Sequence, residues 1–527
     1  MIKPLLLYLF LFAATVPAQV CFTPEIITEC QDLGEDLVAG DFDNDGMPDL
    51  AVTLSYLKKV QLLKGLGTGS FVSLGLLTAS NTPARITGGD FNNDGNMDFA
   101  VNNQFYNATI FHGNGSFGFS SSSPAAFTTG WSRLGITNGD FNNDGTKDLV
   151  VCYDGSNNIG LLIANGNNYN PPGALLSVGN RPADLVAADF NGDGNQDIVT
   201  ANATDNTVSL RFGNGAGSFS AVNTFSTDLD PGSVISDDFN GDGGPDLVTA
   251  NCGPANTGTN TISVLLNNGQ GGFMAAQNIF VGTCTSDVAT GDFNGDGNRD
   301  LVVSVTMGQQ VAILLGNGLG GFSAPVYIPS LIYPLFVVTA DFNADGKDDF
   351  AVTHPGRVGV FLNTGTFMNV SSSSTVICAG ESVTLQVSGG GGKSYGWSTG
   401  STDTSITVAP LINTAYTVLT TDSSGCANSA VYGIHVDACA GLKQFKNPET
   451  ELFTSYPNPA TGSQFTVRSG ADLEVSVINL TGQLVKTVAL SAANQHSITI
   501  SNLPPGSYLL SAQSGGFKTV RRIVLCR

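Results

Sequence analysis

The sequence predicts an all-β fold built from repeats. A nine-residue segment rich in Asp, Asn and Gly occurs seven times, and its copies begin at Asp41, Asp90, Asp140, Asp189, Asp238, Asp292 and Asp341. The copies are 49, 50, 49, 49, 54 and 49 residues apart. Between copies lie four short runs of β-branched and apolar residues, and no stretch has a helical period. Four-stranded units with this period are typical of propeller blades, so we expect a seven-bladed β-propeller.

The unit that begins at Asp292 shows the four expected strands. They cover residues 301–305, 311–316, 324–328 and 335–340, and a Gly-rich turn, GNGLGGF, precedes the third. The 65 Gly residues of the chain suit tight turns between antiparallel strands.

The repeated segment has the pattern of a calcium loop. Positions 1, 3, 5 and 9 always carry an Asp or Asn oxygen and position 6 is always Gly, an alternation that wraps oxygen ligands around Ca²⁺. An EF-hand is excluded, because it needs Glu at position 12 and every copy has Val or Thr there. Position 9 must then complete the ligand set, with a backbone carbonyl from position 7. Position 2 is always Phe and is expected to pack between sheets. Metal-free Asp/Gly turns are the alternative, and seven copies count against it.

The predicted calcium ligands are the residues at positions 1, 3, 5, 7 and 9 of each copy. They are Asp41, Asp43, Asp45, Met47 and Asp49; Asp90, Asn92, Asp94, Asn96 and Asp98; Asp140, Asn142, Asp144, Thr146 and Asp148; Asp189, Asn191, Asp193, Asn195 and Asp197; Asp238, Asn240, Asp242, Gly244 and Asp246; Asp292, Asn294, Asp296, Asn298 and Asp300; and Asp341, Asn343, Asp345, Lys347 and Asp349.

The acidity of the chain supports bound metal. The formal net charge is −22, and the ligand positions alone contain 22 Asp, four in the first copy and three in each of the others. Carboxylates crowded in this way repel one another unless a cation or protons neutralise them. Up to seven structural Ca²⁺ are expected, which would change the formal charge from −22 to −8. The same acidity argues against nucleic acid or an anionic membrane as a partner.

The N-terminus predicts export. Residues 1–18 combine Lys3, an apolar run over residues 5–14 and small residues before an expected cleavage after Ala18, the pattern of a secretory signal peptide. No later stretch reaches 18 apolar residues, so we expect no transmembrane span in the mature chain. A monomer at the cell surface or in the medium is expected.

The repeats resemble a known family. DFNGDGNRDLVV at residues 292–303, followed by VAILLGNGLGGF at residues 311–322, resembles the FG-GAP or VCBS repeat of integrin α-subunit propellers. The resemblance covers residues 19–367 and implies calcium in hairpin loops on one face of a propeller, with ligand binding on a face built by loops. The family includes adhesion receptors, lectin-like binders and accessory regions of polysaccharide-active enzymes, so the ligand does not carry over.

Residues 368–438 lack the repeat and predict a small β-sandwich. Their segments TVICAGESVTLQVSGG and YGWSTG resemble PKD- or Ig-like modules of secreted proteins of the Bacteroidetes. In that resemblance Cys378, Trp397 and Cys426 correspond to the bridge and core Trp of an Ig sandwich. The implied role is a spacer or a weak glycan binder.

A linker at residues 439–452 leads to a last segment, residues 453–527. SYPNP at 455–459, VSVINLTGQLV at 475–485 and the basic ending KTVRRIVLCR resemble the type A C-terminal sorting domain of the type IX secretion system. The resemblance implies a C-terminal β-sandwich, contact with the type IX machinery, passage across an outer membrane and removal of this domain. Cys526 in the last strand departs from the pattern.

Nine Cys in an exported chain predict disulfides. The expected pairs are Cys21 with Cys30, Cys252 with Cys284, and Cys378 with Cys426, which leaves Cys152, Cys439 and Cys526 unassigned.

The sequence favours a binding role and leaves two alternatives open. The four His lie in different units or domains and no nucleophile motif is present, so we expect no enzyme. The main hypothesis is an adhesion module for a surface glycan or protein, bound through the long loops before Trp131 and between Cys252 and Cys284. The alternatives are a calcium-dependent polysaccharide lyase or hydrolase, and a passive structural surface component.

Overall fold

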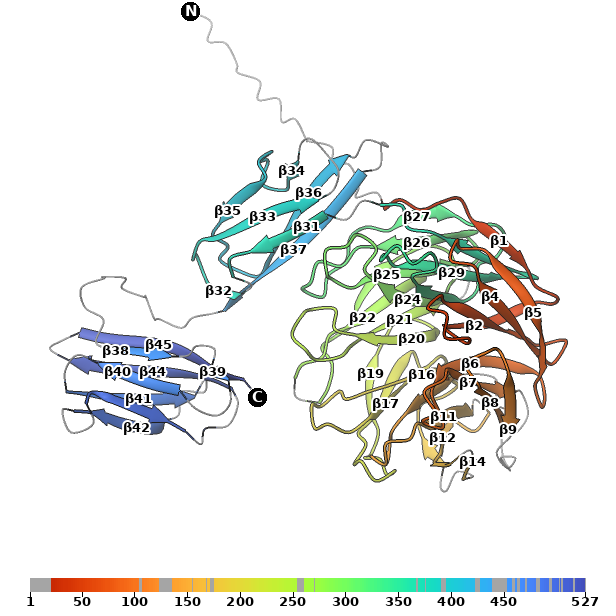
Figure 1. Ribbon diagram of the computed structural model, residues 1–527, viewed down its shortest axis with the longest axis horizontal. Coiled ribbons are helices and arrows are strands. Elements are labelled where there is room, and N and C mark those ends of the chain that lie inside the picture. The colour runs from red at the N-terminus through yellow and green to blue at the C-terminus, as the bar shows by residue number, and fades with distance from the viewer. Residues whose placement is uncertain are drawn as a thin grey trace, which may run out of the picture. The chain divides into compact units, whose positions relative to one another are not determined.

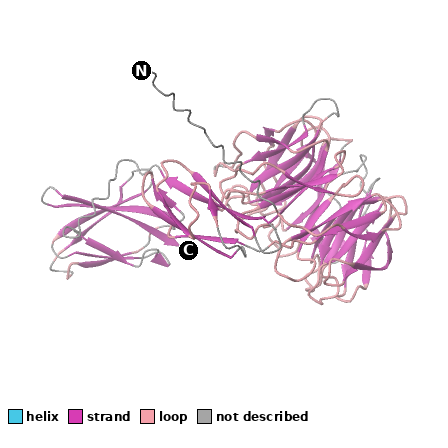
Figure 2. Ribbon diagram, turned by 90° about the horizontal axis from the view of Figure 1, so that it is seen from above, coloured by secondary structure: helices cyan, strands magenta, loops and turns pink. Residues whose placement is uncertain are grey.

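The computed structural model describes residues 20–526 apart from 104–106, 123–134, 154, 167, 171–174, 254–259, 270, 366–367, 375, 390–394, 422–426, 438–452, 457–459, 462–464, 470–471, 480–483, 492–494, 502, 504–505 and 515–516. Every regular element in this part of the chain is a strand, as Figure 2 shows. No helix there has the length and apolar character needed to cross a membrane. The predicted signal peptide, the linker and Trp131 lie outside the described residues.

Each motif copy contributes one four-stranded antiparallel sheet. The first three sheets are β2 (Gly34–Gly40), β3 (Asp49–Leu54), β4 (Lys59–Gly65) and β5 (Phe71–Thr78); β6 (Pro83–Gly89), β7 (Asp98–Asn103), β8 (Asn107–Gly113) and β9 (Phe119–Ser122); and β10 (Ile136–Gly139), β11 (Asp148–Tyr153), β12 (Asn158–Leu162) and β15 (Leu176–Ser177). A small hairpin, β13 (Ala164–Asn165) and β14 (Asn168–Tyr169), interrupts the third.

The other four sheets repeat this order. They are β16 (Pro182–Ala188), β17 (Asp197–Asn202), β18 (Thr207–Arg211) and β19 (Asn223–Ser226); β20 (Pro231–Asp237), β21 (Asp246–Cys252), β22 (Asn260–Leu265) and β23 (Gln277–Phe280); β24 (Thr285–Gly291), β25 (Asp300–Val305), β26 (Gln310–Leu314) and β27 (Val326–Pro329); and β28 (Val337–Ala340), β29 (Asp349–His354), β30 (Arg357–Phe361) and β1 (Ile26–Glu29).

The second strand of each sheet lies between neighbouring sheets. All six residues of β3, β17 and β25 are buried, for example. A strand covered on both faces favours apolar residues on both sides, which explains near-continuous runs such as DLVVSV in place of an alternating pattern. The Phe at position 2 of each motif copy is at most 2% exposed, so its predicted packing role is confirmed.

The first strands of successive sheets contact one another around one centre. The contacts run in the order β2, β6, β10, β16, β20, β24 and β28, and β28 in turn contacts β2. Figure 1 shows the sheets following one another from red to green around this centre. Four-stranded sheets arranged in this way form a β-propeller.

An N-terminal strand closes the last sheet. β1 pairs with β30 in antiparallel register, Ile26 opposite Val360, and in Figure 1 it lies beside the green strands. The preceding residue, Glu25, contacts His354 Nε2 through Oε1 (2.5 Å) and accepts the backbone N–H of Leu331 through Oε2 (2.9 Å). Both ends of the propeller sequence therefore meet in one sheet.

Two further pairs of sheets follow the propeller. β31 (Met368–Ser372), β33 (Val383–Gly389) and β35 (Ser405–Val408) form one sheet, and β32 (Val376–Cys378), β37 (Ala427–Asp437), β36 (Thr414–Thr421) and β34 (Gly396–Trp397) form the other. Trp397 is 4% exposed in their shared core, and its indole N–H donates to Asp403 O. The sheets thus make a sandwich around Trp397.

Residues 438–527 form a separate compact unit. Its sheets are β38 (Phe453–Tyr456), β40 (Phe465–Ser469) and β43 (Ser497–Ile500), and β39 (Ala460–Thr461), β45 (Phe517–Cys526), β44 (Gly506–Ser514), β41 (Leu473–Asn479) and β42 (Leu484–Leu490). Phe465, Val475 and Leu510 are among its buried core residues.

Candidate metal centres

Each motif copy forms the loop between the first and second strands of its sheet. In the fourth copy, Asp189 organises this loop because Oδ1 accepts the N–H of Asp193 (3.1 Å) and Oδ2 accepts the N–H of Gly194 (2.8 Å). The first Asp of every other copy accepts the same two amides at comparable distances. The carboxylate at position 1 therefore folds the loop around itself.

The Gly at position 6 has a backbone reason. Its φ angle lies between 82° and 88° in all seven copies, a left-handed conformation that strains any residue with a Cβ atom. The loop turns back at this point, so that the oxygens before and after the turn face the same space.

The Asp at position 9 joins the loop to its sheet. Asp197, at the start of β17, is completely buried, and it accepts the N–H of Phe190 through Oδ2 (2.9 Å) and of Gly213 through Oδ1 (2.8 Å). Burial raises the pKa of Asp197 to about 6, although the two backbone N–H groups partly oppose the shift. The other ninth-position Asp residues are also 0% exposed. The fold therefore holds these carboxylates in a place where charge is costly without a cation.

Positions 3, 5 and 7 are linked to one another. In the fourth copy Asn191 Nδ2 donates to Asp193 Oδ2 (3.0 Å), and the N–H of Asn195 donates to Asp193 Oδ1 (2.8 Å). That N–H lowers the pKa of Asp193, with a smaller effect from Asn191. The structure thus brings the predicted side-chain ligands of one copy into one loop, while the ligand role of the position 7 carbonyl stays a prediction.

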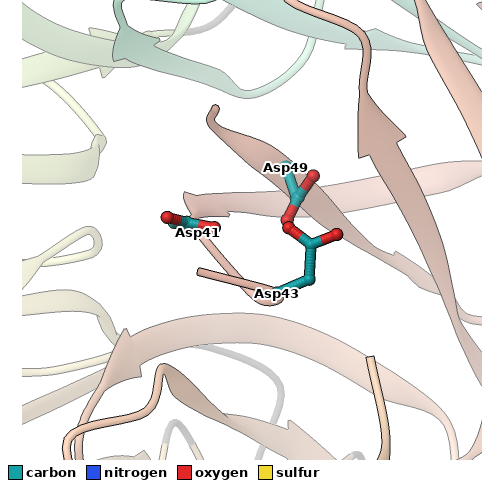
Figure 3. Close-up of side chains that lie close together, drawn as sticks. All are labelled: Asp41, Asp43 and Asp49. Carbon is teal, nitrogen blue, oxygen red and sulfur yellow. The ribbon is translucent and has the colours of Figure 1, made fainter. Parts of the chain in front are cut away.

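The first copy has the clearest cation site. Asp41, Asp43 and Asp49 each offer a carboxylate oxygen, and these atoms lie within 4.8 Å of one another. Figure 3 shows the three carboxylates turned toward one another. Asp43 Oδ1 is buried and has no hydrogen-bond partner among the described residues. Several converging carboxylate oxygens and one orphaned acceptor fit a hard cation such as Ca²⁺, which Asp41, Asp43, Asp45 and Asp49 would hold.

The sixth copy differs because a neighbouring strand touches it. The N–H of Val431, in β37, donates to Asp296 Oδ2 (2.8 Å), and Asn298 Nδ2 donates to Val431 O (2.7 Å). Asp296 is half-buried, whereas the fifth-position Asp of every other copy is exposed. Burial raises the pKa of Asp296 to about 7.

The structure also contains an axial cluster that sequence reasoning missed. Asp36, Arg85, Asp184 and Asp287 each stand five residues before a motif copy, in the strands that meet at the centre. Burial raises the pKa of Asp36 to about 7 and of Asp287 to about 6, and the charge of Arg85 partly opposes both shifts. Asp36 Oδ2 also accepts the N–H of Ile86 in the next sheet (3.0 Å). Their shared position in the repeat was the available signal, but that position carries Asp in three copies, Arg in one, and Gly, Ser or Phe in the rest.

A second missed contact links neighbouring loops. Asn44 Nδ2 donates to Asn96 Oδ1 (3.0 Å), and Asn143 Nδ2 donates to Asn195 Oδ1 (2.8 Å). Position 4 of one copy thus reaches position 7 of the next. Asn44 and Asn143 have left-handed φ angles of 59° and 56°, which Asn tolerates better than most residues. The Asn residues of the motif therefore have a geometric role in addition to the predicted role of those at position 3 as ligands.

One predicted disulfide is confirmed and one is wrong. Cys252 and Cys284 are bonded, as expected. Cys30 is a free thiol, and burial raises its pKa to about 12, so it is not the partner of Cys21. Cys21 is disulfide-bonded. Cys30 directly follows β1, and its N–H donates to Gly356 O (2.8 Å). The pairing of β1 with β30 therefore determines where Cys30 lies. The side chains of Cys378 and Cys426 lie outside the described residues.

Comparison with solved structures finds several similar chains. BBS1N, from a crystal structure of its complex with ARL6DN soaked with lead, is 12% identical, covers 66% of this chain and 98% of its own, and has a TM-score of 0.49. A functionally unknown protein from Desulfotomaculum acetoxidans is 12% identical, with coverage of 57% and 90% and a TM-score of 0.39. A protein from Lactobacillus plantarum is 15% identical, with coverage of 57% and 86% and a TM-score of 0.46. At these scores the fold assignment depends on the strand pairing of this chain itself.

No curated protein is significantly similar to the chain. Two family matches cover most of it. Residues 41–101, 90–151, 140–200, 189–249, 238–303 and 292–352 match the FG-GAP-like repeat, and residues 454–526 match the secretion system C-terminal sorting domain. The repeat matches contain all seven acidic loops, and the sorting domain indicates a secreted or cell-surface location through the type IX pathway. The chain therefore belongs to the FG-GAP-like repeat family, as a secreted propeller protein that carries a C-terminal sorting domain.

Proposed function

We propose that this protein is a seven-bladed, calcium-stabilised propeller that binds a glycan or protein at the cell surface. The blade number is supported by the seven repeats, each with its own four-stranded sheet, and by the contact of β28 with β2. The proposed metals are structural, because the protein oxygens of each loop fill most of the coordination shell of Ca²⁺.

The observation that carries the binding role is the difference between the two ends of the sheets. In an antiparallel meander, the loops after the first and third strands lie at one end, and the loops after the second and fourth strands lie at the other. The acidic motif takes the first end in every repeat. The other end varies, and it exposes Tyr56 (75%), Met307 (61%) and Ile332 (50%). Exposed aromatic and apolar side chains on loops are common in recognition surfaces.

The loops at this second end are also braced. Cys252 is the last residue of the second strand of one sheet, Cys284 directly precedes the first strand of the next, and the disulfide joins them. The segment between Cys252 and Cys284, predicted as a long binding loop, contains β22 and β23, and its residues 254–259 and 270 lie outside the described residues. A rigid end with varied side chains suits recognition, because less conformational entropy is lost on binding.

The first experiment measures the metal. The propeller is dialysed against millimolar calcium and its bound calcium is counted by elemental analysis. We expect close to seven Ca²⁺ per chain and a lower melting temperature in EDTA. A calcium content near zero, or an unchanged melting curve in EDTA, contradicts the proposed metal sites.

The second experiment measures binding to a glycan array and to surface proteins of the native host. Tyr56→Ser and Ile332→Ser are expected to weaken saturable binding while calcium content stays the same. Val72→Ser is the matched control, because Val72 is a 46% exposed apolar residue on β5, away from these loops. Turnover of a polysaccharide panel would favour the enzymatic alternative, and the absence of any saturable ligand would favour a passive structural role.

A further inference from the structure

The first calcium loop differs from the other six in its charge. Position 3 is Asp43, whereas every other copy has Asn there. The first loop therefore carries four carboxylates among its side-chain ligands and each of the others carries three. An additional carboxylate in so small a space needs a compensating positive charge.

The Asn at position 3 has a defined partner in the other loops. Its amide nitrogen donates to Oδ2 of the Asp at position 5 in four of them, from Asn92 to Asp94 (3.0 Å), Asn142 to Asp144 (2.9 Å), Asn191 to Asp193 (3.0 Å) and Asn294 to Asp296 (3.1 Å). In the first loop this donor is missing, because a carboxylate at position 3 faces the carboxylate of Asp45.

Lys64 replaces the missing donor. Its ammonium group, from β4, contacts Asp43 Oδ2 and lies 2.7 Å from Asp45 Oδ2. It also lies 5.5 Å from the centre of the Phe117 ring, which positions it further. The lysine leaves Asp43 Oδ1 unpaired, and Asp43 still contributes an oxygen to the cluster with Asp41 and Asp49.

The position of Lys64 is occupied differently in the other sheets. The residue that precedes the amide bonded to the ninth Asp is Lys64 here, and it is His112, Ile163, Phe212, Leu266, Leu315 or Leu362 elsewhere. At this place in the sheet, lysine occurs only in the repeat that has Asp at position 3 of its motif. With the charge of Lys64 counted, the side-chain ligands of the first loop carry a formal charge of −3, the charge that the ligand carboxylates alone give the other loops. In the seventh loop Lys347, at position 7, also lies 3.1 Å from Asp345 Oδ2, but there position 3 is Asn343.

We propose that Lys64 is an internal counter-ion that sets the calcium response of the first loop. It holds Asp43 and Asp45 together as Asn does elsewhere, and it leaves Asp43 Oδ1 free to bind the metal. Lys64 is thus a positioning residue and not a substitute for calcium. The inference rests on the proposed calcium binding of the loops.

The test compares four variants of the full chain. Lys64→Met removes the ammonium group and keeps most of the stem, Asp43→Asn gives the first loop the position 3 residue of the others, and a third variant combines both changes. Lys59→Met is the control, because Lys59 lies on the same strand and donates to Thr78 Oγ1, away from the loop. Hydrogen–deuterium exchange of residues 41–65 is measured in EDTA and in calcium, with residues 189–213 as internal reference.

In EDTA, Lys64→Met is expected to speed exchange of residues 41–65 about threefold to fivefold, the range for a partly exposed ion pair. Calcium should remove that difference, and adding Asp43→Asn should remove it in EDTA as well. The number of bound calcium ions should stay the same in Lys64→Met.

Three outcomes would overturn the counter-ion role. One is that Lys64→Met behaves like Lys59→Met; the second is that Asp43→Asn fails to rescue it. The third is a gain of one calcium ion in Lys64→Met, which would mean that the lysine displaces the metal. If residues 41–65 and 189–213 of the unchanged protein do not respond to calcium at all, the proposed calcium binding itself fails instead.

Discussion

Replacing Asp197 with Asn separates the two roles of the ninth carboxylate. This side chain anchors two backbone amides and is also a predicted calcium ligand. Asn has nearly the same shape as Asp but no charge. It can accept only one of the two backbone N–H groups that Asp197 accepts, because its NH₂ group faces the other. The variant therefore changes charge and one hydrogen bond without opening a cavity.

The expected effect without calcium is small. Burial raises the pKa of Asp197 to about 6 from its ordinary value of 3.8, so a neutral side chain avoids a cost of about 3 kcal/mol near pH 8. Against this, the N–H of either Phe190 or Gly213 loses its acceptor, which costs about 1–3 kcal/mol. The two effects nearly cancel, so the unfolding midpoint of Asp197→Asn in EDTA should stay close to that of the unchanged protein.

The expected effect in calcium is a clear loss. For a loop with a dissociation constant of about 10⁻⁴–10⁻³ M, calcium at about 10 mM stabilises the folded state by about 1.4–2.7 kcal/mol. Asp197→Asn should lose this contribution. Urea unfolding with and without calcium measures it, and Asp205→Asn, a change at an exposed carboxylate that accepts the N–H of Asn180, is the control. Equal destabilisation of Asp197→Asn in both buffers would refute the metal role of this residue.

Three other measurements test separate features. Burial raises the pKa of Asp36 to about 7, so its neutral form stabilises the fold at pH 4 and this contribution is lost as pH rises through 7. The urea midpoint of Asp36→Asn should therefore rise relative to that of the unchanged protein between pH 5 and pH 8, and a constant difference would contradict this. Replacing Cys252 and Cys284 with Ser should destabilise the propeller by about 3–4 kcal/mol, since the bond closes a loop with a sequence separation of 32; an unchanged melting temperature would show that the loop is held by other contacts. Intact mass of the secreted protein should show loss of about the last 75 residues, and a surface protein that retains Arg527 would rule out removal of the sorting domain.

The parts of the fold that follow from local chemistry were predictable. A Gly that must adopt a left-handed φ, a Phe that must enter the space between sheets and a run such as DLVVSV each depend on a few neighbouring residues. Sevenfold repetition makes such signals strong. The four-stranded unit and the acidic loops could therefore be predicted from the sequence alone.

Contacts between residues far apart in the sequence could not be predicted in the same way. Lys64 lies 19 residues from Asp45, on another strand, and only the register of β3 and β4 brings their charges together. Asp36, Arg85 and Asp287 belong to three different repeats, and the matching position holds Gly, Ser or Phe in three others, so no motif marks them. The wrong pairing of Cys21 with Cys30 has the same origin, because closeness in sequence was the only available guide.

The two kinds of contact also differ in what they require of the chain. Each acidic loop spans nine residues, so its ligands come together when one hairpin forms, and calcium can support repeats one at a time. Closure of the ring instead joins β1 to β30, residues separated by more than 300 positions, and the entropy cost of such a contact is high until the intervening sheets are folded. Glu25, next to β1, adds its contacts with His354 and Leu331 only at that stage. With the calcium sites proposed above, calcium binding is therefore expected to precede ring closure.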